Sequence, residues 1–213
     1  VRETAGVFDQ SSFAKYELCG RDAGEALSWI CANRVTRGPG RLTYTQMLNT
    51  RGGIECDLTV AQLADDKFYI VTGPGFRTHD FAWIADHIKP GLDAVLTDVT
   101  ESWGTLSLMG PRSRDILARV TGADVGNAAF PFGHVRQIDI AGHPVRALRV
   151  TYVGELGWEL HIPITELGLV YDALIAADPD LRPVGYRALE SLRLEKGYRA
   201  WGSDIGPDHT PLE

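Results

Sequence analysis

Short segments with alternating strand-like and helix-like patterns make up this chain, and this alternation limits its fold more than any other feature of the sequence. In the strand-like segments apolar and polar residues alternate with a period of two, whereas in the helix-like segments apolar residues return every three or four positions. Glycine turns separate neighbouring strand-like segments, and the Ala-Gly at residues 141–142 is typical of a β-hairpin. The pattern predicts an α+β fold.

The order of these segments predicts one interlocked body for residues 1–213, since no flexible linker divides them. Strand–helix–strand cycles occur twice, so residues 1–105 and 106–213 are possible subdomains. The expected strands are residues 14–18, 42–48, 54–63, 68–72, 92–99, 104–109, 138–140, 145–151 and 156–164. The expected helices are residues 21–32, 78–88, 110–120, 166–177 and 184–196.

Composition and charge exclude several classes of protein. Of the 213 residues 44% are hydrophobic and 23% charged, a balance typical of a folded globular protein. The 21 basic and 28 acidic residues give a net charge of −7, which argues against nucleic acid as a partner because nucleic acid requires a basic face. No apolar run is long enough to span a membrane, and the three cysteines fit a reducing compartment, so we expect a cytoplasmic protein.

The first candidate motif is Gly-Gly-Ile-Glu-Cys-Asp-Leu at residues 52–58. The two glycines allow positive φ angles and a close approach of the backbone. In the strand that follows, Glu55 and Asp57 point to one face, and Cys56 points to the other with its apolar neighbours. A carboxylate in such a strand is costly unless it is solvated, paired or functional. Asp57 therefore belongs either to a solvated strand face or to a functional site.

The second candidate motif is Tyr-Val-Gly-Glu-Leu-Gly-Trp-Glu-Leu-His at residues 152–161, which combines glycines, aromatic rings and carboxylates. An acid beside an aromatic ring suits a flat heterocycle, because the carboxylate accepts a pair of N–H bonds while the ring stacks. A bulged hairpin with charges at its edge is the alternative. The motif lacks the lysine of a phosphate-binding loop.

The third candidate motif is the helical segment at residues 187–197. Glu190 and Arg193 have the i, i+3 spacing that is typical of a surface ion pair. Arg187 lies at the start of the helix outside that pair. It is either a solvated charge or a bidentate partner for a carboxylate.

Other kinds of site are not indicated by the sequence. The segment at residues 73–75 lacks the third glycine of a dinucleotide fingerprint, so we expect no flavin or nicotinamide domain here. The six histidines have no metal-binding spacing, and we therefore expect no metal site. Cys56 has no partner nearby in the sequence and is expected to be a buried, unreactive thiol.

In this order, the three motifs resemble the folate-binding aminomethyltransferase family. This family includes the glycine-cleavage aminomethyltransferase and the C-terminal folate halves of dimethylglycine and sarcosine dehydrogenases. The resemblance covers essentially the whole chain. Its most specific parts are residues 44–57, 152–159 and 187–197.

One departure from the family pattern points to a branch within it. The glycine pair leads to Asp-Asp-Leu in the stand-alone enzymes, whereas here Cys56 precedes Asp57, which favours the dehydrogenase branch. The resemblance implies two interlocked subdomains with mainly antiparallel sheets and flanking helices. It also implies a preceding flavin domain and a following small β-barrel. Because the chain starts at Val1 without a methionine and stops at Glu213, we expect a fragment that lacks both, with FAD confined to a separate domain of the parent chain.

The resemblance also assigns roles to individual residues. Asp57 matches the catalytic aspartate of the family, and Glu159 matches the glutamate that holds the pterin ring. The other expected cofactor-binding residues are Tyr152, Arg187, Tyr44 and Glu155.

The implied reaction is a tetrahydrofolate-dependent one-carbon transfer that forms 5,10-methylenetetrahydrofolate from an iminium or aminomethyl donor. A carboxylate such as Asp57 would accept the proton of the attacking nitrogen. The expected partners are the folate and an amine or iminium substrate, with a flavin domain in the same parent chain. The location becomes the mitochondrial matrix if the source is eukaryotic. Two alternatives stay open: a stand-alone glycine-cleavage aminomethyltransferase, which uses a lipoyl carrier protein, and a non-catalytic folate-binding or regulatory relative.

Overall fold

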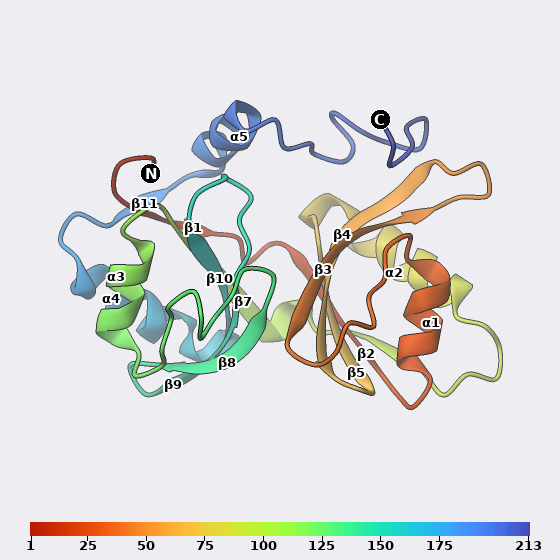
Figure 1. Cartoon of the computed structure of the whole chain (residues 1–213), viewed down its shortest axis with the longest axis horizontal. Coiled ribbons are helices and arrows are strands. Elements are labelled where there is room, and N and C mark those ends of the chain that lie inside the picture. Colours follow the sequence, from red (N-terminus) through yellow and green to blue (C-terminus); the bar gives the residue numbers. More distant parts are fainter. The chain divides into compact units, whose positions relative to one another are not determined.

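The computed structural model describes residues 1–213 and divides them into two compact units, each built around one open sheet (Figure 1). The first unit contains Val1–Ser12 and Glu101–Tyr198, and the second contains Phe13–Thr100 and Arg199–Glu213. The chain therefore leaves the first unit after its first strand and returns to it later. A single cut between residues 105 and 106 would separate that first strand from the strand with which it pairs.

The sheet of the first unit has six strands in the order β11-β1-β7-β10-β9-β8, and every neighbouring pair is antiparallel except β1 and β11. Helices α3 and α4 lie side by side against this sheet (Figure 1). The strands are β1 (Gly6–Asp9), β7 (Trp103–Met109), β8 (Val135–Ile140), β9 (His143–Leu148), β10 (Gly157–Pro163) and β11 (Arg182–Val184). The helices are α3 (Ser113–Val120), α4 (Leu167–Ala177) and α5 (Tyr186–Glu195).

The two faces of this sheet differ in chemistry. On one face, strand residues such as Leu108 and Trp158 pack against Leu117 of α3 and Leu174 of α4. Because side chains alternate along a strand, the next residues on β7 and β10 point to the opposite face. There a small apolar cluster forms around Phe8, and the neighbouring positions are polar.

The sheet of the second unit has five strands in the order β3-β4-β5-β2-β6, and all of its pairs are antiparallel. Apolar residues of one face, among them Tyr16 and Ile70, share a core with Leu27 of α1 and Ile84 of α2. The strands are β2 (Ala14–Cys19), β3 (Arg41–Leu48), β4 (Ile54–Ala64), β5 (Lys67–Thr72) and β6 (Val95–Asp98). The helices are α1 (Ala23–Ile30) and α2 (Arg77–His87).

The structure confirms the predicted α+β class with mainly antiparallel sheets and flanking helices. Every expected strand and helix is present, with ends displaced by a few residues. The hairpin between β8 and β9 turns at Ala141 and Gly142, whose φ angles of 51° and 89° are both positive, as a two-residue hairpin requires. The sequence did not predict β1 and β11, which are short and pair with strands distant in sequence. No helix is long and apolar enough to cross a lipid bilayer.

Candidate functional site

Asp57 lies near the start of β4, on the face of the sheet that points away from α1 and α2. The burial pattern of β4 alternates from Ile54 to Leu58, so the predicted separation of Asp57 from Cys56 is confirmed. Gln46 of β3 stands directly opposite Asp57 in the antiparallel register, and its Nε2 donates to Asp57 Oδ1 over 2.8 Å. Tyr44, two residues earlier on β3, also bonds to this carboxyl group. The structure therefore brings together two of the predicted site residues, Tyr44 and Asp57.

The surroundings of Asp57 change its acidity. Burial raises the pKa of the carboxyl group, the hydrogen bonds from Tyr44 and Gln46 lower it, and the charge of Asp80 raises it again. The net effect is a pKa above the ordinary value for aspartate. A half-buried carboxylate with a raised pKa is a stronger proton acceptor than a solvated one.

The second motif forms a loop and the start of β10 in the first unit. Val150, Thr151 and residues 154–157 of this loop line a pocket of about 260 Å³, which Phe132 and Tyr198 border with aromatic rings. Tyr152 is not among the residues that line it. The ring of Tyr152 stacks on that of Tyr198 at a centroid distance of 6.3 Å and an interplanar angle of 17°. Gly154 has a φ angle of 72°, which favours glycine, and this lets the loop turn back towards β10.

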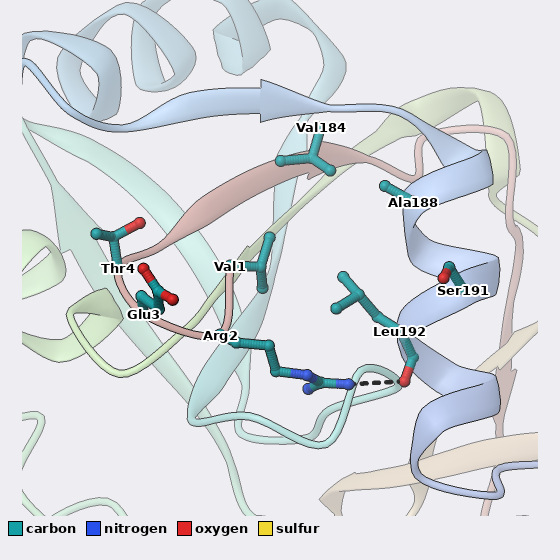
Figure 2. A pocket seen from close by; sticks show the side chains of 8 residues that line it. All are labelled: Val1, Arg2, Glu3, Thr4, Val184, Ala188, Ser191 and Leu192. Carbon is teal, nitrogen blue, oxygen red and sulfur yellow. Dashed lines mark hydrogen bonds between the residues drawn. The ribbon is translucent and has the colours of Figure 1, made fainter.

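Glu155 takes part in ion pairs within the first unit. Its Oε1 is 3.0 Å from Nη1 of Arg2 and 3.8 Å from Nζ of Lys196. Arg2 also donates to the backbone oxygens of Val153 and Leu192, and thereby links the loop to α5. Figure 2 shows Arg2 reaching towards Leu192 beside a cavity of about 600 Å³, and none of the predicted site residues lines that cavity.

Glu159 lies on β10 in a row of polar side chains that the sequence did not single out. It stands opposite Ser107 of β7, and the next pair on the same face of the sheet is His161 and Thr105. His161 is fully buried, with Nε2 3.7 Å from Glu159 Oε2 and Nδ1 3.2 Å from the Thr105 hydroxyl. The hydroxyl of Ser107 donates to the side-chain oxygen of Gln10. Because these residues are separated by many positions in sequence, only the strand register reveals the row.

The third motif forms α5, and the structure corrects one expectation there. Arg187 is exposed in the first turn of the helix. Arg193, expected to belong to a surface pair, is 2% exposed and bonds to Glu190 and to the backbone oxygen of Tyr198. The segment after α5 folds back over this guanidinium, and its carbonyl group replaces the solvent that a surface arginine would contact.

Known proteins identify the family of the chain. Residues 1–213 match the family model of the GCVT N-terminal domain. Human mitochondrial sarcosine dehydrogenase is 43% identical over 228 residues, which cover 100% of this chain and 25% of that protein. Mouse mitochondrial dimethylglycine dehydrogenase is 35% identical over 216 residues, again with 100% of this chain and 25% of that protein.

A solved structure agrees with these matches. The glycine cleavage system aminomethyltransferase T from Bartonella henselae superposes with a TM-score of 0.87 at 30% sequence identity, over 99% of this chain and 56% of that one. The chain therefore belongs to the GCVT N-terminal domain family, as the resemblance implied. It spans about a quarter of the length of the two dehydrogenases.

Proposed function

We propose that this chain is the folate domain of a sarcosine- or dimethylglycine-dehydrogenase-like protein, and that it catalyses one-carbon transfer to tetrahydrofolate with formation of 5,10-methylenetetrahydrofolate. The observation that carries this proposal is the Asp57 carboxyl group, which two side chains of β3 hold on the helix-free face of its sheet. Membership of the GCVT family supports an aminomethyltransferase-type reaction.

In the proposed mechanism Asp57 accepts the proton that a folate nitrogen loses when it attacks the donor carbon. Nitrogens of this kind are weak bases, and a carboxylate within hydrogen-bond reach promotes their attack by general base catalysis. The negative charge of Asp57 also stabilises a cationic iminium donor. Gln46 and Tyr44 orient the carboxyl group, because their hydrogen bonds restrict its rotation.

The residues of the first unit supply groups that suit a folate. Glu159 presents a carboxylate, which accepts paired N–H bonds from a pterin ring. Tyr152 and its stacking partner Tyr198 add flat aromatic surface. Arg187 is exposed and has no carboxylate partner, so its guanidinium is available for the anionic glutamate tail of a folate. Glu155 is already paired with Arg2, and we assign it a supporting role in the loop.

The comparison with relatives favours the dehydrogenase branch over a stand-alone glycine-cleavage enzyme. Identity to human sarcosine dehydrogenase is 43%, against 30% to the Bartonella aminomethyltransferase. A parent chain of the dehydrogenase type would carry FAD in a separate domain and supply the iminium donor from there. A eukaryotic parent would be mitochondrial, as the human and mouse dehydrogenases are named.

Replacement of the carboxylate tests this proposal. We expect Asp57→Ala to lower the rate of 5,10-methylenetetrahydrofolate formation by about 100- to 10,000-fold, the usual contribution of a general base. Tetrahydrofolate binding, measured by calorimetry, should persist, and the unused iminium should hydrolyse to formaldehyde. Asp65→Ala is the matched control, because Asp65 is an exposed acid in the turn that follows β4. Wild-type product formation by Asp57→Ala would contradict the proposal.

A further inference from the structure

Cys56, His79 and Asp80 form a cluster that the proposed reaction does not use. Cys56 lies on β4 and points into the core of the second unit, while His79 and Asp80 belong to the first turns of α2. The thiol sulfur, an imidazole nitrogen and a carboxylate oxygen all lie within 4.8 Å of one another. We propose that these three side chains bind a divalent transition-metal ion, with Zn²⁺ as the ion that fits the donor set best.

The donors match the chemistry of zinc. A thiolate, an imidazole and a carboxylate are its three usual protein ligands, whereas Mg²⁺ and Ca²⁺ take oxygen ligands only. Metal–ligand distances of about 2.0–2.3 Å place tetrahedral ligand atoms about 3.3–3.8 Å apart. The observed cluster therefore closes on an ion with side-chain movements of about 1 Å. A fourth position would stay open for water.

A supporting set of contacts surrounds the three donors. Thr72 Oγ1 donates to Asp80 Oδ2 over 2.5 Å, and this leaves Asp80 Oδ1 on the side of His79, 2.9 Å from Nδ1. The other imidazole nitrogen, Nε2, is 3.8 Å from Glu55 Oε2. A carboxylate behind the second nitrogen of a histidine is the arrangement that orients metal-bound histidines.

Two tryptophan rings lie nearly parallel to the His79 ring. The centroid of Trp83 is 6.4 Å from that of His79 at an interplanar angle of 18°, and the centroid of Trp201 is 6.1 Å away at 29°. The Glu55 carboxylate is itself fixed, because Asn49 Nδ2 donates to its Oε1 over 2.8 Å. The imidazole therefore has aromatic and acidic neighbours around it before any ion binds.

Two of the three donors are shielded from solvent, and the third is exposed and leaves an entry path for an ion. Cys56 and Asp80 are each 1% exposed, whereas the side chain of His79 is 43% exposed. An ion would enter past the imidazole and bind to two buried donors behind it. Zn²⁺ together with one thiolate and one carboxylate has no net charge, so the bound cluster avoids an uncompensated charge in the core.

Without a metal, the Cys56 thiol hydrogen-bonds to the Asp80 carboxylate. Metal binding would form the metal–sulfur bond and release the thiol proton to solvent, as is general for thiolate ligands. Neither oxidation nor reduction is involved.

Titration of the chelator-treated protein with Co²⁺ and Zn²⁺ tests the site. We expect binding of one ion per chain, release of one proton, and a cobalt–thiolate charge-transfer band in the near ultraviolet. Cys56→Ser should abolish that band, and His79→Gln should lower affinity by more than about 100-fold. Glu55→Gln, which removes the carboxylate behind His79, should lower affinity by about 10- to 100-fold.

Matched controls separate the site from nonspecific binding and from the proposed reaction. Cys19→Ser and His134→Gln change a cysteine of β2 and a histidine of the first unit, and both should bind metal as the wild type does. Asp57→Ala should also bind normally, so loss of turnover and loss of metal binding are distinguishable. His79 is half-exposed, so His79→Gln should fold even if Cys56→Ser does not. Absence of stoichiometric binding, or unchanged affinity in His79→Gln, would overturn the proposal.

Discussion

The two sheets share one plan but differ on the face that points away from α3 and α4 in the first unit and from α1 and α2 in the second. In the first unit the polar side chains near Glu159 are buried and hydrogen-bonded to one another, as His161 and Ser107 show. In the second unit Asp57 is half-buried and receives its bonds from Gln46 and Tyr44 of the adjacent strand. The buried groups beside Glu159 thus contribute to stability, whereas the half-buried acids Glu159 and Asp57 stay accessible.

The largest change in stability should come from the apolar core of the first unit. Trp158 is fully buried among the residues that pack under α3 and α4, and Trp158→Ala should lower the free energy of unfolding by about 3–5 kcal/mol. Its indole N–H has no hydrogen-bond partner, so Trp158→Phe should cost much less. Urea denaturation followed by circular dichroism measures both. Equal losses in the two variants would show that packing does not explain the role of Trp158.

Smaller losses of stability should distinguish the polar residues of the first sheet from those around Asp57 in the second. Ser107→Ala leaves the buried oxygen of Gln10 unpaired and should cost about 1–3 kcal/mol of stability with binding of folate retained. Gln46→Ala acts next to a half-buried acid, so it should cost less than about 1 kcal/mol yet reduce turnover. Denaturation and product formation are measured on both. A larger loss of stability in Gln46→Ala than in Ser107→Ala would contradict the difference between the two sheets.

The contacts of Arg2 should contribute a similar or slightly smaller part of the free energy of unfolding. Arg2→Ala removes the ion pairs to Glu155 and Glu195 and leaves two backbone oxygens without their donor, so we expect a loss of about 1–2 kcal/mol. Arg21→Ala is the control, because Arg21 is exposed and pairs only with the next residue, Asp22, so its loss should have no measurable effect. Thermal unfolding of both variants decides whether Arg2 holds the loop to α5.

The smallest expected effect is the pH dependence of the stability that Asp98 contributes. Partial burial raises the pKa of Asp98, but hydrogen bonds from Arg77 and Thr100 outweigh it and place the pKa below the ordinary value. A carboxyl group with a lowered pKa stabilises the fold above its unfolded pKa of about 3.9 and loses that contribution as the pH falls through its folded value. The stability advantage of the wild type over Asp98→Asn should therefore be constant near neutral pH and shrink below about pH 4. An advantage that grows in acid would contradict the assignment.

Local patterns in the sequence predicted the elements because those patterns determine which face of a strand or helix is buried. The alternation around Asp57 and the stripe along residues 21–32 depend on neighbouring residues only, and both predictions hold. The strand β1 was missed because its four residues gain their partners from β7, about 100 positions later in the chain. Pairings of that kind leave no periodic signal.

Residues that lie close in the chain were easier to place than distant ones. Tyr44 and Asp57, both named from the family resemblance, lie on adjacent strands of one hairpin. The ion pair between Arg2 and Glu155 joins residues 153 positions apart and was not predictable. The spacing rules for metal ligands did not single out the proposed ligands Cys56, His79 and Asp80, because a strand and a helix bring them together. The expectation of no metal site depended on those spacings alone.

The central claim is that Asp57 contacts the reacting nitrogen of a bound folate. A crystal structure with 5-formyltetrahydrofolate, a stable analogue of the folate substrate, measures this most directly. The account predicts a ligand nitrogen within hydrogen-bond distance of an Asp57 carboxylate oxygen, about 2.6–3.2 Å. A folate bound with its reactive nitrogens remote from Asp57 would contradict it.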